Sequence, residues 1–222
     1  ADTERTRLRV LTLNCWYVVP PHCRPSLPLT SSSSSFFRGL WLLADKRRQR
    51  IAAIADWIAN SHDAQFDVIA LQEVWVRADF DLIADRAKDA GMTHSRFFYR
   101  SVRSPFRFPF LPADLCVAIR TSGAIGSGLG LISRHPIVSA FVSPYLLNGS
   151  PIPFVDDWFA GKAVCGITVQ VPAVGKVDVL NTHMFAPGGE ADNVKGAHRI
   201  AQAWDLARMA VEKAERGRHV IA

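Results

Sequence analysis

Short apolar runs alternate with amphipathic stretches along most of this 222-residue chain. Runs rich in Val, Ile and Leu and bounded by turn residues are typical of buried strands. They fall at residues 8–13, 67–71, 129–133, 137–142, 163–171, 176–181 and 219–222. Pro172 and Gly175 separate two of these runs, so residues 163–171 and 176–181 predict a β-hairpin.

Three segments predict helices. The first, 46–59, repeats apolar residues at the spacing of a helix that packs by one face: Ile51, Ile54, Ala55 and Ile58. The second, 79–90, ends at Gly91, which suits a helix C-cap. The third, 192–215, carries five apolar residues on one side: Ile200, Ala203, Trp204, Ala207 and Val211. Helices interspersed with strands and a hairpin argue against a purely parallel sheet. They predict an α+β or mixed α/β layered sandwich, in one domain over residues 1–222.

Two stretches of 22 residues, 17–38 and 100–121, interrupt this pattern with prolines and no periodicity. We expect both to be irregular insertions without a place in the core. Structureless loops of this length are uncommon in a compact domain unless they are functional or disordered. Two interpretations stay open, long surface loops and translated introns of a gene prediction, and the sequence of the transcript would decide between them.

Composition is that of a globular protein, with 49% hydrophobic and 21% charged residues. The net charge of +6 suits an anionic partner such as a phospholipid headgroup, a membrane surface or a nucleic acid, and does not choose among them. The four cysteines lack paired spacing, which argues against a zinc site or a disulfide framework and favours an intracellular setting. The sequence contains neither a signal peptide pattern nor an apolar stretch of the length that spans a bilayer.

Polar side chains follow three of the predicted strands: Asn14, Glu73 and His183. A carboxylate that leaves an apolar strand is costly to desolvate unless a cation meets it, and Mg²⁺ prefers such oxygen ligands. A histidine in this position can stabilise charge on a phosphoryl oxygen. Each residue alone has an ordinary structural explanation, but together they predict one site.

Residues 156–163, DDWFAGKA, partly resemble the end of a phosphate-binding loop. The pattern requires glycine where Asp156 stands and Ser or Thr where Ala163 stands, so we reject a nucleotide site of this type. An ion pair between Asp157 and Lys162 is plausible in this segment. The alternative is an ordinary surface pair of little energetic worth.

Six segments resemble neutral sphingomyelinases in order and spacing, and the later ones most resemble the fungal inositol phosphosphingolipid phospholipases C. They are LNCW (13–16), DVIALQEVW (67–75), SGAIGSGLGLISRHPI (122–137), DWFAGKA (157–163), NTHMFAP (181–187) and AHRIAQAWDLA (197–207). Removing 17–38 and 100–121 restores the family spacing. The resemblance implies a four-layer αββα sandwich of the endonuclease/exonuclease/phosphatase superfamily, incomplete here because the C-terminal third is missing.

The resemblance also implies roles for the site residues. Glu73 would bind Mg²⁺, with Asn14 in the metal and phosphate network, and His183 would contact the scissile phosphate. Asp157 and Lys162 would form an activation switch. The substrate would be a sphingolipid, cleaved by an activated water to ceramide and a phosphorylated headgroup. Anionic membrane lipids are expected partners, with peripheral membrane association and no nucleic acid.

Departures from the family lead to a further expectation. The family's Gly-Asp-x-Asn motif and its later Asp-His pair, which carries the general base, are absent from this sequence. We therefore expect the 222-residue chain alone to be inactive or nearly so. The transmembrane segments found after the catalytic region of fungal relatives are also absent, and headgroup preference and oligomeric state stay open.

Three other functions compete with this interpretation. A nuclease or abasic-site endonuclease of the same superfamily would share Asn14, Glu73 and His183, but would carry a basic stripe along a groove. The segments 157–163 and 197–207 favour the lipid enzyme instead. An inositol polyphosphate phosphatase is a weaker choice. A non-catalytic, lipid-binding fragment would leave an apolar face uncovered.

Overall fold

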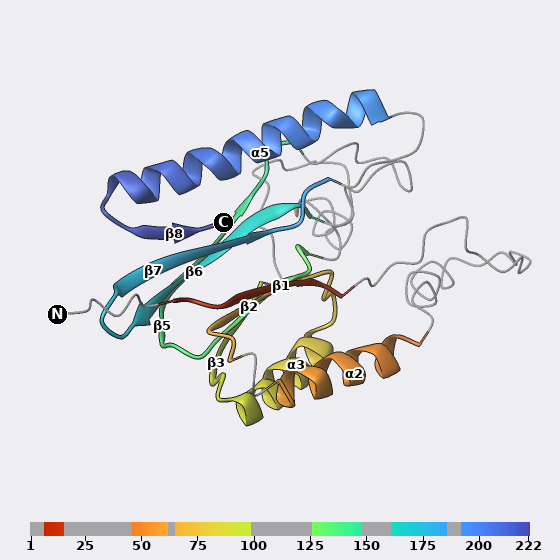
Figure 1. The fold of residues 1–222 in the computed structure, drawn as a ribbon. Helices are drawn as coiled ribbons and strands as arrows, with labels where there is room; N and C mark the ends of the chain where they lie inside the picture. The colour runs from red at the N-terminus through yellow and green to blue at the C-terminus, as the bar shows by residue number, and fades with distance from the viewer. Residues whose placement is uncertain (1–6, 16–45, 62–64, 99–125, 148–160, 186–191) are drawn as a thin grey trace, which may run out of the picture.

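Two four-stranded sheets lie face to face between layers of helices in the computed structural model of the chain (Figure 1). The structure describes residues 7–15, 46–61, 65–98, 126–147, 161–185 and 192–222. Helices α2 and α3 cover the outer face of one sheet, and α5 covers the outer face of the other (Figure 1). The predicted mixed α/β sandwich is therefore confirmed.

The first sheet has the strand order β1-β2-β4-β3. Its strands are β1 (Val10–Asn14), β2 (Val68–Gln72), β4 (Leu129–Ser133) and β3 (His94–Phe98). Strands β1 and β2 run parallel, with Asn14 opposite Gln72, while β4 is antiparallel to both of its neighbours. Every residue of β2 and β4 is buried, because these central strands are covered on both faces.

Helices α2 (Arg47–Ala59) and α3 (Arg77–Ala87), followed by the short 3₁₀ helix η2 (Lys88–Ala90), pack on the outer face of this sheet. Three of the four predicted contact residues of α2 are buried, and Ile54 is partly buried against them. The predicted end at Gly91 is confirmed, since this glycine adopts a left-handed conformation with φ of 79°.

The second sheet has the order β5-β6-β7-β8. It contains β5 (Ile137–Pro144), β6 (Ala163–Val171), β7 (Gly175–Thr182) and β8 (His219–Ile221). The predicted hairpin is confirmed as the antiparallel pair β6-β7. Helix α5 (Asp192–Glu215) lies between β7 and β8 in the chain, and β8 pairs in parallel with β7. Apolar residues of β2 and β4 meet those of β6 and β7 to form the core between the sheets.

Three features differ from the sequence-based expectation or go beyond it. Strand β3 was not predicted, because its sequence HSRFF has little apolar alternation. Strands β4 and β5 are separated by only three residues yet belong to different sheets. The apolar side predicted for α5 faces solvent, and the helix packs through another row, Leu206, Met209 and Ala210.

Charged side chains fix the C-terminal end of α5 to the second sheet. Asp178 of β7 is buried and accepts a hydrogen bond from Thr168 of β6. Lys213 and Arg218 approach the same carboxylate at 3.7 and 3.3 Å. A buried charge needs such partners, so this cluster holds the helix end, the hairpin and the start of β8 together. The expected insertions, 17–38 and 100–121, lie outside the described residues.

Gly130 of β4 should not tolerate a side chain. A Cβ at this position would lie 2.5 Å from the ring of Phe80, which is itself buried against Phe97. We expect Gly130→Ala to lower the free energy of unfolding by about 1–3 kcal/mol, as overpacking does in well-filled cores. Urea denaturation measures this change.

Gly196→Ala is the matched control, because the Cβ would meet no atom within 4 Å in helix α5. There alanine should raise stability by about 0.5–1 kcal/mol through its higher helix propensity. Equal effects of the two substitutions would contradict the close approach of Phe80 to β4.

Candidate active site

Parallel pairing brings the ends of β1 and β2 to one edge of the first sheet. Asn14 is the last residue of β1 and Glu73 follows the last residue of β2. Glu73 has a φ of 58°, a left-handed conformation that residues with a Cβ rarely adopt. The following amide, of Val74, donates to the carbonyl of Gly128 at 2.9 Å and fixes the turn. Such strained positions cluster at functional sites.

The structure brings together the three residues predicted at the ends of strands. The prediction that the first strand is buried was wrong, because β1 is an edge strand whose residues are alternately exposed and half-buried. Asn14 donates from Nδ2 to Oε1 of Glu73 at 2.9 Å. Nε2 of His183, which follows β7, lies 3.7 Å from the same oxygen. The Glu73 side chain is mostly buried, and His183 is partly exposed. A carboxylate, an amide and an imidazole from both sheets therefore meet at one edge of the sandwich.

Lys162 joins the cluster through the other ring nitrogen of His183. Its Nζ lies 3.3 Å from Nδ1, and the residue is only 2% exposed. An ammonium group can only donate, so Nδ1 accepts and the proton of a neutral imidazole sits on Nε2, facing Glu73. Lys162 thus orients the histidine. Asp157, its expected switch partner, lies outside the described residues.

Two buried amides that sequence reasoning did not assign to the site connect the sheets directly behind it. Gln72 donates from Nε2 to Oδ1 of Asn181 at 2.6 Å. Asn181 in turn donates to the carbonyls of Leu71 and Gly130, at 2.9 and 3.2 Å. Gln72 precedes Glu73, and Asn181 lies two residues before His183. The sequence signal for their role was their position beside the site residues, in the segments LQE (71–73) and NTH (181–183).

Comparison with known proteins identifies the family. The statistical model of the Endonuclease/Exonuclease/phosphatase family matches residues 11–222. This chain belongs to that family. A protein of Schizosaccharomyces pombe named inositol phosphosphingolipids phospholipase C is 29% identical, covering 97% of this chain and 40% of the relative. Sphingomyelin phosphodiesterase 2 of Mus musculus is 32% identical, covering 91% of this chain and 37% of the relative. The chain thus spans about two-fifths of the length of these relatives.

Solved structures agree on the fold of this family member. SmcL superposes with a TM-score of 0.59 at 14% identity, covering 93% of this chain and 58% of SmcL. A beta toxin of Staphylococcus aureus, solved with bound magnesium ions, gives a TM-score of 0.55 at 13% identity, covering 92% of this chain and 60% of the toxin. At such identities the likeness establishes the shared sandwich alone.

The oxygen donors of Glu73 and Asn14 suit a magnesium ion. The described residues contain no group of three or more His, Cys, Asp or Glu side chains that could hold a metal. Mg²⁺ is held by one or two carboxylates while water and phosphate oxygens fill its other positions. The carboxylate of Glu73 with the carboxamide of Asn14 fits this pattern.

Burial also raises the pKa of three groups near the sheets of this family member. Desolvation, reinforced by the charge of Glu73, raises the pKa of the Cys15 thiol from 9.0 to about 12. Desolvation likewise raises the pKa of Tyr145 from 10.0 to about 12 and that of Cys165 well above 9.0. Cys15 and Cys165 are both free thiols. All three groups are neutral at physiological pH.

The amide pair between the sheets should contribute strongly to stability. Asn181→Leu removes three hydrogen bonds, including the one from Gln72, which keeps its bonds to Thr12 and Ala70. We expect a loss of about 2–4 kcal/mol in the free energy of unfolding. Gln72→Met should also destabilise. A double-mutant cycle, measured by urea denaturation, should give a coupling of about 1–3 kcal/mol. Additive effects of the two substitutions would show that the bond contributes nothing.

Alkaline pH should destabilise the fold. The three raised pKa values mean that the folded chain keeps protons that the unfolded chain releases. Their contribution is fully present below the ordinary pKa of the thiols, 9.0, and is lost as pH rises toward about 12. Urea midpoints measured across this range should fall steadily. Tyr145→Phe should flatten the upper part of the curve, and an unchanged curve would contradict the assignment.

Proposed function

We propose that this chain forms the metal- and phosphate-binding edge of a magnesium-dependent phosphodiesterase that acts on sphingolipids. The carrying observation is the cluster of Asn14, Glu73, His183 and Lys162, contributed by both sheets and connected by contacts of 2.9 to 3.7 Å. Relatives named as a phospholipase C of inositol phosphosphingolipids and a sphingomyelin phosphodiesterase support the choice of substrate. Hydrolysis would add water across the phosphoester bond and release ceramide and a phosphorylated headgroup.

Glu73 and Asn14 are the residues that would hold Mg²⁺. When bound, the ion would offset negative charge that develops on the phosphoryl oxygens. A beta toxin with this fold contains magnesium ions, which supports the choice of metal. The hydrogen bond from Asn14 orients the Glu73 carboxylate before any ion arrives. A preoriented carboxylate loses less conformational freedom on binding than a mobile one.

His183 and Lys162 would act on the phosphate. With its Nδ1 occupied by Lys162, His183 presents an N–H at Nε2 toward the space beside Glu73. That group can donate to a phosphoryl oxygen and stabilise the charge of the transition state. The ammonium of Lys162 adds a positive charge in a poorly solvated place, where its effect on an anion is large. We also propose the switch: Lys162 would pair with Asp157 in one state and contact the substrate in the other.

Two parts of the proposal concern the whole protein. Peripheral association with anionic membrane lipids would present the sphingolipid to the site. None of the described helices combines the length and apolar character needed to cross a bilayer. The expectation that the 222-residue chain alone is inactive stays a prediction. Hydrolysis of radiolabelled sphingomyelin and inositol phosphosphingolipid tests it, and near-normal turnover would refute it.

Glu73→Gln should remove most magnesium binding while keeping the shape of the side chain. We expect at least about a tenfold loss of Mg²⁺ affinity, since one coordinating charge is gone. Calorimetric titration and the Mg²⁺-induced rise in melting temperature measure this, and any hydrolysis should fall by a larger factor.

Glu212→Gln on the surface of α5 is the control, because Glu212 pairs only with Arg216 among described residues. It should bind Mg²⁺ like the unmodified chain. Unchanged Mg²⁺ binding by Glu73→Gln would defeat the proposed metal role. Glu73-dependent cleavage of plasmid DNA, without cleavage of sphingolipid, would favour the nuclease instead.

A further inference from the structure

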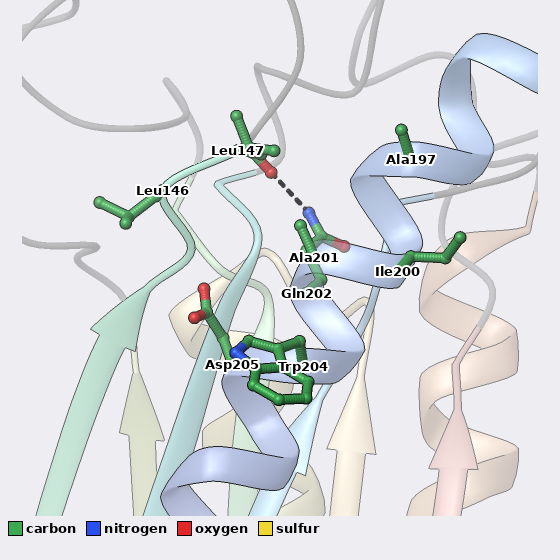
Figure 2. A pocket seen from close by; sticks show the side chains of 8 residues that line it. All are labelled: Leu146, Leu147, Ala197, Ile200, Ala201, Gln202, Trp204 and Asp205. Atoms are coloured by element: carbon green, nitrogen blue, oxygen red, sulfur yellow. Dashed lines mark hydrogen bonds between the residues drawn. The ribbon is translucent and has the colours of Figure 1, made fainter.

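An apolar groove of about 490 Å³ lies between α5 and the residues that follow β5 (Figure 2). We call it the α5 groove. Leu146 and Leu147 form one side, and α5 forms the other (Figure 2). The apolar residues from the helix are Ala197, Ile200, Ala201 and Trp204. Gln202 and Asp205 are the polar residues of the lining.

Large apolar side chains at the α5 groove are exposed to solvent. Leu146 is 91% exposed, Ile200 73% and Trp204 71%. Single exposed apolar residues are common, but a contiguous group of Leu, Ile and Trp marks an interaction surface. The helix does not need these side chains for its own packing, since Leu206, Met209 and Ala210 already contact the sheet. The exposed row is thus a second apolar face of α5.

Hydrogen bonds tie the α5 groove to the candidate active site. Gln202, fully buried, donates from Nε2 to the carbonyl of Leu147 at 2.8 Å (Figure 2). Its Oε1 accepts from the amide of Phe185, also at 2.8 Å, two residues after His183. On the other side, the amide of Tyr145 donates to the carbonyl of Lys162 at 3.1 Å. The groove is therefore held beside the edge that carries Lys162 and His183.

Charge on this face is mixed: the acidic Asp205 lies in the groove lining, and a basic residue farther along the helix can meet an anionic surface. One turn beyond Trp204, the exposed Arg208 lies in the same row, which continues to the exposed Val211. Arg208 makes no ion pair with a described residue. The acid Glu212, next along the helix, is already paired with Arg216. A helix face that combines Trp, Ile and Arg, in a chain of net charge +6, is typical of binding at the boundary between lipid headgroups and hydrocarbon.

We propose that the α5 groove, with the row Ile200, Trp204 and Arg208, docks the protein on a sphingolipid-containing bilayer. Leu146 and Trp204 enter the headgroup boundary, and Arg208 meets anionic lipids. Docking there brings the edge with His183 and Lys162 to the plane in which the phosphodiester of a bilayer lipid lies. This inference rests on the proposed function, because it names the surface by which the same site reaches its substrate.

Flotation with lipid vesicles tests the proposal. The probes are vesicles of phosphatidylcholine, sphingomyelin and 20% phosphatidylserine, and the same vesicles without phosphatidylserine. The double variant Ile200→Ser, Trp204→Ser should reduce the vesicle-bound fraction at least fivefold. Arg208→Ala should reduce binding only to the anionic vesicles. Ile200, Trp204 and Arg208 are all exposed, so thermal melts of these variants should match the melt of the unmodified chain.

Trp57→Ser is the matched control, because Trp57 is a half-exposed tryptophan on α2, in the opposite helical layer. It should float like the unmodified chain. Equal loss of binding in this variant and the groove variant would overturn the proposal, as would unchanged binding of the groove variant.

The other occupants of the groove give different results. A chain that dimerises through the groove would become monomeric in the double variant, as light scattering measures, while its vesicle binding would stay as before. That result overturns the proposal in favour of a second copy. Absence of vesicle binding by the unmodified chain overturns it as well.

Failure of docking and failure of the proposed function are separable. Glu73→Gln should float normally, and the groove variant should keep its Mg²⁺ affinity. Lost metal binding by Glu73→Gln with unchanged flotation of the groove variant would therefore reject the docking surface alone. Normal metal binding by Glu73→Gln, together with reduced flotation of the groove variant, would reject the metal site and retain the surface.

Discussion

The hydrogen bond between Gln72 and Asn181 sets the arrangement on which the candidate site depends. It joins β2 to β7 where the two sheets meet, and Asn181 also binds backbone carbonyls of β2 and β4. Both amides are buried, so each must find partners within the protein or pay a desolvation cost. Apolar contacts between sheets are not directional. The bond between the two amides is, and it aligns β2 with β7, the strands after which Glu73 and His183 stand.

That alignment places an imidazole between two groups of opposite charge. His183 lies between the ammonium of Lys162 and the carboxylate of Glu73, touching one with Nδ1 and approaching the other with Nε2. Under the proposed function, an incoming cation would compete for the Glu73 end of this chain of contacts, and an incoming phosphate would compete for the Lys162 end.

Local sequence patterns predicted the strands and helices except β3, and they predicted that Asn14, Glu73 and His183 would meet, since polar residues at strand ends can project from a rigid scaffold into one site. They could not predict that β4 and β5, three residues apart, enter different sheets, because this depends on which surfaces are already covered. The contact of Lys162 with His183 joins residues 21 positions apart through hairpin register. The roles of Gln72 and Asn181 were missed for the same reason. Each has an ordinary neighbourhood in sequence and acquires its partner only when two sheets pack.

Helix α5 illustrates why periodicity alone misassigns a face. Its sequence contains two apolar rows, and the row with the larger side chains, Ile200 and Trp204, was the stronger signal. The sheet instead receives Leu206, Met209 and Ala210, since Lys213 and Arg218 must reach the buried carboxylate of Asp178. This electrostatic anchor fixes the rotation of the helix about its axis. Near the middle of the helix, Gln202 points inward to hold Phe185 and Leu147, and the same rotation leaves Ile200 and Trp204 outside. The exposed apolar row is thus a consequence of satisfying buried polar groups near the middle and at the C-terminal end of one helix.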